Sequence, residues 1–171
     1  LNLTGEDVIS LRYKDEITTN GESPVLQYDG RLVSTGNLQI TDREYEEDVQ
    51  LLHVGEKIFL KVNDPDQDVS DERDSILVTV TTELGEAETV SLFETTVHSG
   101  EFTGAFDLEA TEKPTVNNIT PEASQIETYF GDQVTVAYTD GKSAESTEAL
   151  ELTQSLPVVV GTDGLVIAFS K

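Results

Sequence analysis

The chain has 171 residues and a formal net charge of −24, because 34 Asp and Glu residues outnumber ten Lys and Arg residues. So negative a chain would repel the phosphates of a nucleic acid, which excludes an electrostatic nucleic-acid binder. No apolar run approaches the ~20 residues of a membrane-spanning helix, which excludes a membrane span. The hydrophobic share of 36% is sufficient for one folded domain.

The sequence contains neither Cys nor Met. The absence of Cys excludes disulfides and thiolate chemistry. The absence of Met predicts that the chain is processed, and we expect that a signal peptide has been removed. An extracellular or cell-surface location follows as an expectation. The acidity itself has two explanations that stay open here, a solubilising surface or surroundings rich in cations.

Alternation with period two begins near the N-terminus and predicts a β protein. Residues 8–13 alternate, with Ile9, Leu11 and Tyr13 on one face. Residues 25–40 carry shorter apolar segments broken by turn sequences. Thr41 to Glu44 has the form of a capping box and is a candidate helix start, but we favour an acidic loop there.

The predicted strands farther along the chain are separated by frequent turns. They cover residues 57–62, 75–81, 89–94, 101–108, 133–138, 149–153 and a C-terminal hairpin of 157–160 with 165–169. About nine or ten short strands with little helix indicate an all-β sandwich or barrel. The spacing of Phe102 and Phe106 places both on one face, in the core. Tyr13 and Tyr138 are predicted as core residues at strand ends.

Two segments share a pattern. Residues 7–15 and 132–140 both fit D-x-[VI]-x-[LV]-x-Y-x-D, so we expect related strands with Asp15 and Asp140 at the same rim. The predicted organisation has an N-terminal strand in residues 1–15, a β-sandwich module in 16–140, and a strand and hairpin in 141–171 that complete the domain. The terminal strands either pair with a neighbouring subunit or pair inside their own sandwich.

The densest polar feature is the acidic segment of residues 63–74. Its carboxylates can converge on one hard cation if the loop curls, and calcium suits them because it accepts six to eight oxygens in irregular geometry. A solvated turn is the alternative, because Asn-Asp-Pro and Asp-Pro-Asp are favourable turn sequences. The candidate metal ligands are Asp64, Asp66, Asp68, Asp71 and Asp74.

Several of these pieces occur in a recognisable order. Residues 62–66 (Val-Asn-Asp-Pro-Asp), the strand at 89–95, Ser99 to Gly104, and the strand at 131–140 resemble immunoglobulin-like β-sandwich repeats. Such repeats occur in large secreted and cell-surface proteins of bacteria and archaea. The resemblance covers roughly residues 50–140. It implies an immunoglobulin-like antiparallel β-sandwich that is structural or adhesive, is often stabilised by cations, and performs no catalysis.

We do not expect an enzyme, because His53 and His98 lie outside any catalytic motif. The predicted function is an extracellular structural subunit that self-assembles into a filament or surface layer. Assembly would use β-strand exchange between copies of the chain, with calcium stabilisation. The alternative is a secreted adhesive or carbohydrate- or protein-binding module, with other surface proteins or glycans as partners.

Asn2 and Asn118 begin glycosylation sequons.

Overall fold

The computed structural model describes residues 4–5, 7–16, 21, 24–83, 87–111, 125–144 and 148–160. Its elements are β1 (Val8–Lys14), β2 (Val25–Arg31), β3 (Asn37–Thr41), β4 (Leu52–His53), β5 (Lys57–Asn63), the 3-10 turn η1 (Pro65–Gln67), β6 (Ser75–Thr82), β7 (Ala87–Glu94), β8 (Glu101–Ala110), β9 (Gln125–Thr128), β10 (Gln133–Asp140) and β11 (Leu150–Val159). The expected all-β class is confirmed, with eleven strands described. None of the described helical structure has the length and hydropathy of a membrane span.

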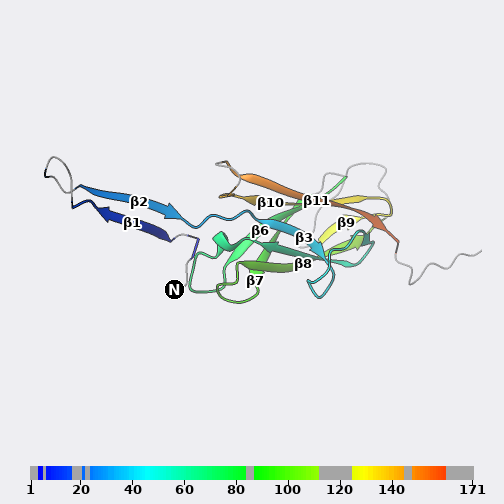
Figure 1. Cartoon of the computed structure of the whole chain (residues 1–171). Coiled ribbons are helices and arrows are strands. Elements are labelled where there is room, and N and C mark those ends of the chain that lie inside the picture. Colours follow the sequence, from blue (N-terminus) through cyan, green and yellow to red (C-terminus); the bar gives the residue numbers. More distant parts are fainter. Residues whose placement is uncertain are drawn as a thin grey trace, which may run out of the picture.

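Nine strands form one sheet in the order β3-β5-β8-β7-β6-β10-β11-β4, with β9 pairing in parallel to β8. The sheet curls on itself into a half-barrel (Figure 1). Strand β3 at one end of this order approaches β11 near the other end, and the backbone N–H of Ile40 donates to the side-chain oxygen of Gln154 at 2.7 Å. The curl follows from the twist that adjacent strands impose on one another.

The core fills the inside of this curl. Alternate residues of the strands point inward and are buried, for example Leu60 and Val62 of β5 and Val136 of β10. Phe102 and Phe106 of β8 are buried too, which confirms that prediction. Period-two alternation therefore predicted the inward-facing residues correctly in these strands.

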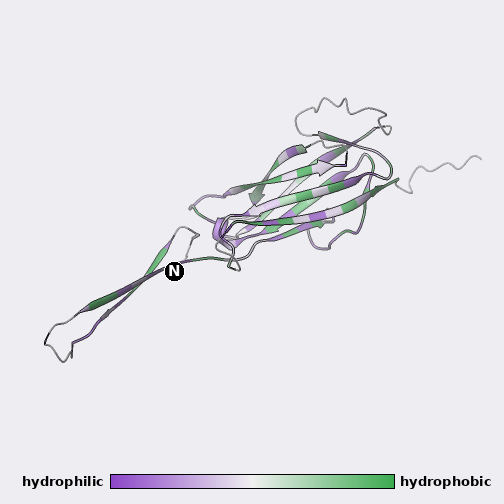
Figure 2. Ribbon diagram, turned by 90° about the horizontal axis from the view of Figure 1, so that it is seen from above, coloured by the Kyte–Doolittle hydropathy of each residue, from purple (hydrophilic) through white to green (hydrophobic). Residues whose placement is uncertain are grey.

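The first two strands lie outside the main sheet. β1 pairs antiparallel with β2, from Val8 opposite Arg31 to Lys14 opposite Val25. This pair forms a separate two-stranded hairpin that extends away from one end of the half-barrel (Figures 1 and 2). The prediction for Tyr13 was therefore wrong: 59% of its surface is exposed because no core lies beneath β1, whereas Tyr138 is buried as predicted.

Other segments refine the sequence-based picture. Residues 42–47 form a turn, closed by the Asp42 N–H donating to the Glu47 carbonyl at 2.9 Å. β11 is one ten-residue strand that covers both short segments predicted between 149 and 160. The predicted strand at 165–169 and the sequons at Asn2 and Asn118 lie outside the described residues.

Candidate functional site

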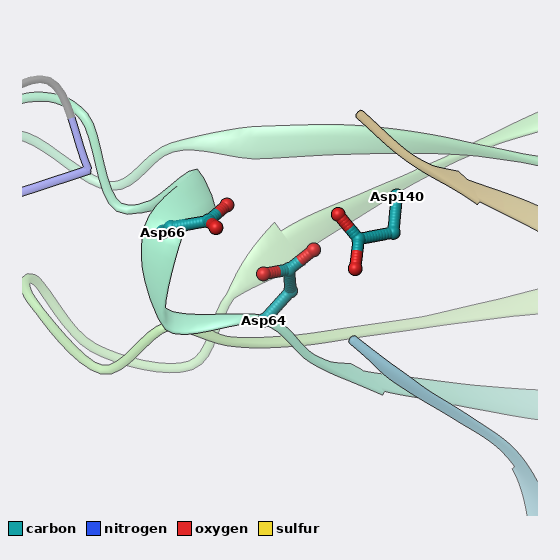
Figure 3. Close-up of side chains that lie close together, drawn as sticks. All are labelled: Asp64, Asp66 and Asp140. Atoms are coloured by element: carbon teal, nitrogen blue, oxygen red, sulfur yellow. The ribbon is translucent and has the colours of Figure 1, made fainter. Parts of the chain in front are cut away.

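Three aspartates meet where the hairpin joins the half-barrel. Asp64 directly follows β5, Asp66 lies in η1, and Asp140 ends β10. All three are fully buried, and one carboxylate oxygen from each lies within 4.8 Å of the others (Figure 3). Pro65 occupies the first position of η1, where its fixed φ favours the turn that brings Asp66 back towards Asp64. We call this group the root cluster.

Neutral donors from the segment after β2 reach all three carboxylates. The Ser34 hydroxyl donates to Asp64 at 3.0 Å, and the Ser34 N–H donates to Asp66 at 3.0 Å. The Gly36 N–H donates to Asp140 at 2.9 Å. On the other side of the hairpin, the Gly5 N–H donates to the Asp68 carbonyl. Both ends of the hairpin are thus tied to the acidic segment.

The electrostatics of the root cluster favour its neutralisation. Burial raises the pKa of Asp64 above its ordinary value, and the negative charges of Asp66 and Asp140 raise it further. The Tyr138 hydroxyl donates to Asp64 at 2.6 Å and acts in the opposite direction on that pKa. The pKa of Tyr138 itself is raised, first by its burial and then by this hydrogen bond to Asp64. A proton or a cation relieves the same repulsion.

Asp68, Asp74 and Glu94 form a second acidic group, again with oxygens within 4.8 Å of one another. The carboxylates of Asp74 and Glu94 hold the backbone of loops, whereas that of Asp68 lies 3.1 Å from Nδ1 of His98. Asp74 accepts from the Val69 N–H at 2.8 Å, and Glu94 accepts from the N–H groups of Asp74 and Gly100 at 3.0 and 2.8 Å. We interpret this group as a structural one that fixes the backbone of the loop between η1 and β6.

Four of the five aspartates predicted as one metal site are distributed over two groups, and the fifth, Asp71, lies outside both. Asp64 and Asp66 lie in the root cluster, while Asp68 and Asp74 lie in the second group. The Asp71 side chain is fully exposed, with one oxygen 3.7 Å from the imidazole of His98.

Two residues outside the acidic segment complete these groups. Asp140 was expected at the rim with Asp15, and the structure places it in the root cluster, whereas Asp15 follows β1 on the hairpin. Glu94 was not predicted as part of an acidic group, although the alternation that makes Val90 and Leu92 inward-facing also places Glu94 on the inward face at the end of β7.

The root cluster presents oxygen atoms of the kind that hard cations such as calcium bind. Calcium binds carboxylate, carbonyl and hydroxyl oxygens at about 2.3–2.6 Å, so its ligands lie up to about 5 Å apart. The carboxylate oxygens of Asp64, Asp66 and Asp140 satisfy that spacing. The Ser34 hydroxyl oxygen, 3.0 Å from Asp64, adds another oxygen at the same point.

No protein-family model and no curated protein matches the sequence.

With calcium chelated, we expect the melting temperature to rise as the pH is lowered from neutral through the raised pKa of Asp64. The raised pKa of Asp64 means that the folded chain binds a proton where the unfolded chain does not. This carboxyl therefore adds stability as the pH falls through its raised pKa, and that stability is lost as the pH rises. Differential scanning calorimetry of the wild type and Asp64→Asn measures the effect. The variant should gain less on acidification, and an equal gain in both proteins would contradict the assignment.

Proposed function

We propose that this chain is a structural subunit of an extracellular or cell-surface assembly, and that it joins copies of itself through the β1–β2 hairpin. The observation that carries the proposal is the exposure of large apolar side chains on one face of this hairpin. The five residues have between 52% and 73% of their surface exposed, and they are Ile9, Leu11, Tyr13, Leu26 and Tyr28. Contiguous exposed apolar patches mark interaction surfaces.

The strand register separates the two faces of the hairpin. Leu11 lies opposite Tyr28 and Tyr13 lies opposite Leu26, so these residues share the apolar face. On the other face the Ser10 hydroxyl donates to Asp29 at 2.5 Å, in a network of polar cross-strand contacts. A two-stranded hairpin is at best marginally stable in water by itself. A partner that covers the apolar face would therefore stabilise the hairpin as well as the complex.

The charge distribution supports a second copy as that partner. The strands of the hairpin contain three of the ten Lys and Arg residues, namely Arg12, Lys14 and Arg31, but only Asp29 among the 34 Asp and Glu residues. Their net charge is therefore +2, but with Asp15, Glu16 and Glu22 between the strands residues 8–31 carry −1, and the rest of the chain carries −23. This nearly neutral segment is repelled by a second acidic copy much less than the rest of the chain is.

In this proposal, calcium at the root cluster stabilises the connection between the hairpin and the half-barrel. The donors to the root cluster come from Ser34 and Gly36, which immediately follow the hairpin. A bound cation would neutralise the three carboxylates and fix the segment that carries the hairpin. Calcium would thereby hold the hairpin in a fixed direction for docking.

The resemblance to immunoglobulin-like repeats supports the same proposal, since it implies secreted structural modules. As the finer mechanism, we propose that the unit given to a neighbour is the β1–β2 hairpin rather than a single terminal strand. The hairpin extends from one end of the half-barrel (Figure 2), so it would contact a different surface on its neighbour. Contacts of this heterologous kind produce filaments or layers when they do not close into a ring.

Sedimentation velocity with two matched variants tests the proposal. Leu11→Ser/Tyr28→Ser removes apolar surface from the apolar face, and Val8→Ser/Val25→Ser removes it from the opposite face, where both valines are more than half exposed. With calcium present, we expect the wild type and the valine variant to form larger species as concentration rises. The Leu11/Tyr28 variant should stay monomeric with an unchanged melting temperature for the half-barrel.

The proposal fails if the wild type stays monomeric in calcium at all concentrations, or if the two variants assemble equally. The first result would favour the alternative of a monomeric adhesive or ligand-binding module. The second would show that the apolar face of the hairpin does not mediate the contact.

A further inference from the structure

We infer that the apolar face of the hairpin packs, in a second copy, on the outer face of β6, β7, β10 and β11. This inference rests on the proposed function and names the receiving surface. The outward positions of those strands follow from the register, and we call them the hydroxyl face. They are Ser75, Leu77, Thr79 and Thr81, Ala87, Thr89, Ser91 and Phe93, Gln133, Thr135, Ala137 and Thr139, and Glu151, Thr153, Ser155 and Pro157.

The hydroxyl face is almost without charge in a very acidic chain. Nine of its sixteen residues are Ser or Thr, and Glu151 is its single charged residue. The outer face of β5 and β8 provides the comparison within the same sheet. It carries ion pairs between Lys57 and Asp107 at 2.6 Å and between Lys61 and Glu101 at 2.7 Å. Depletion of charged residues distinguishes the centre of an interface from other protein surface.

The shape and chemistry of the hydroxyl face are suitable for packing against the apolar face of the hairpin. A shallow hollow of about 800 Å³ lies along it, lined by Thr79, Thr135 and Ala137 among others. The Thr135 and Ser155 hydroxyls bond to each other at 2.6 Å, which satisfies polar atoms within the face. Methyl groups and the exposed side chains of Leu77 and Phe93, at 62% and 55%, supply apolar area.

The hairpin and the hydroxyl face match in length and in polarity. Each hairpin strand has seven residues and spans about 23 Å, which fits along the eight-residue strands β6 and β10. Packing of the apolar face on this surface covers Leu11 and Tyr28 without removing a charge from water. Arg12 and Lys14 lie on the opposite face of the hairpin and would remain solvated.

A second copy is required because the hairpin points away from its own sheet (Figure 1). Its two ends are held by the bond from the Gly5 N–H to the Asp68 carbonyl and by the bonds from Ser34 to Asp64 and Asp66. These contacts direct the hairpin outward, so the hydroxyl face that it meets belongs to a neighbour.

Disulfide trapping tests the contact directly, because the chain has no cysteine of its own. A Leu11→Cys chain is mixed with a differently tagged Ala137→Cys chain in calcium under mild oxidation. The matched control uses Ala105→Cys, an exposed outward position at the middle of β8, on the charged outer face. We expect the mixed disulfide between positions 11 and 137 in clear excess over that between 11 and 105.

A second pair of variants measures the effect on affinity. Ala137→Arg places a charge at the centre of the hydroxyl face. Ala105→Arg places the same charge on the charged outer face of β5 and β8. We expect Ala137→Arg to weaken self-association at least about tenfold, because an unpaired charge resists desolvation. Ala105→Arg should assemble like the wild type. Equal melting temperatures of the two variants would show that neither effect is a folding defect.

The possible results separate this inference from the proposed function. If the wild type assembles through the hairpin, but position 11 crosslinks equally to 105 and 137 or Ala137→Arg assembles normally, the hairpin docks elsewhere and only this inference is overturned. Dominant disulfides between two copies of position 137 would overturn it as well, in favour of face-to-face packing. A wild type that never self-associates would overturn both.

Discussion

Replacement of Gly100 by alanine should lower the free energy of unfolding by about 2–5 kcal/mol. Gly100 has a φ of +59°, a left-handed conformation that is costly for any residue with a Cβ. An added Cβ would also lie 2.6 Å from the Cα of Pro65, which is backbone and cannot rotate away. Both costs act at one buried position.

The same substitution should disturb the root cluster. The Gly100 carbonyl accepts from the Asp64 N–H at 2.8 Å, and the Gly100 N–H donates to the buried Glu94 carboxylate. A shift of Gly100 away from Pro65 therefore moves η1 and weakens both acidic groups. We expect calcium to stabilise this variant less than it stabilises the wild type.

Two glycines provide matched controls for Gly100→Ala. Gly131 has a φ of +89° with open space around it, so Gly131→Ala should cost only the conformational term of about 1–2 kcal/mol. Gly141 has open space and needs no left-handed φ, so Gly141→Ala should be nearly neutral. Urea unfolding of the three variants measures these differences. Equal losses at Gly100 and Gly131 would show that the contact with Pro65 carries no energy.

Calcium should stabilise the wild type by about 2.7 kcal/mol at one hundred times its dissociation constant, which corresponds to a rise in melting temperature of about 5–11 °C. The reason is that calcium bound as proposed would remove the mutual repulsion of Asp64, Asp66 and Asp140, all of which are fully buried. Magnesium should stabilise less, because it requires octahedral geometry and gives up water reluctantly.

Asp140→Asn and Asp71→Asn test which carboxylates bind the ion. Asp140 belongs to the root cluster, whereas Asp71 is fully exposed outside both acidic groups. We expect Asp140→Asn to abolish most of the calcium-induced shift and Asp71→Asn to retain it, as measured by calorimetry with calcium and with chelator. Loss of the shift in Asp71→Asn alone would place the ion in the outer loop.

The strands of the half-barrel were predictable because their inward residues alternate. Ile58, Leu60 and Val62 in β5 illustrate this, since every second residue is apolar and buried. The hairpin was not predictable by the same argument, because residues 7–15 carry the same pattern as residues 132–140. Alternation indicates which side chains share a face, but it does not indicate what covers that face.

The two acidic groups were likewise predictable from the sequence only in part. The alternation of Asp64 and Asp66 suggested that they converge, and they do so because η1 turns the chain between them. Asp68 lies beyond that turn and joins Glu94 instead, which sequence spacing does not reveal. Asp140 was expected near this rim from the internal similarity, but its burial against Asp64 depends on long-range packing of β10.

Hydrogen exchange of the hairpin amides at increasing protein concentration tests the central claim most directly. A two-stranded hairpin without a core beneath it should exchange fast in the monomer, and docking on a second copy should protect it. We predict that protection of β1 and β2 grows with concentration in calcium, while the strands of the half-barrel stay equally protected throughout. Protection of the hairpin that does not change with concentration would contradict its role in joining subunits.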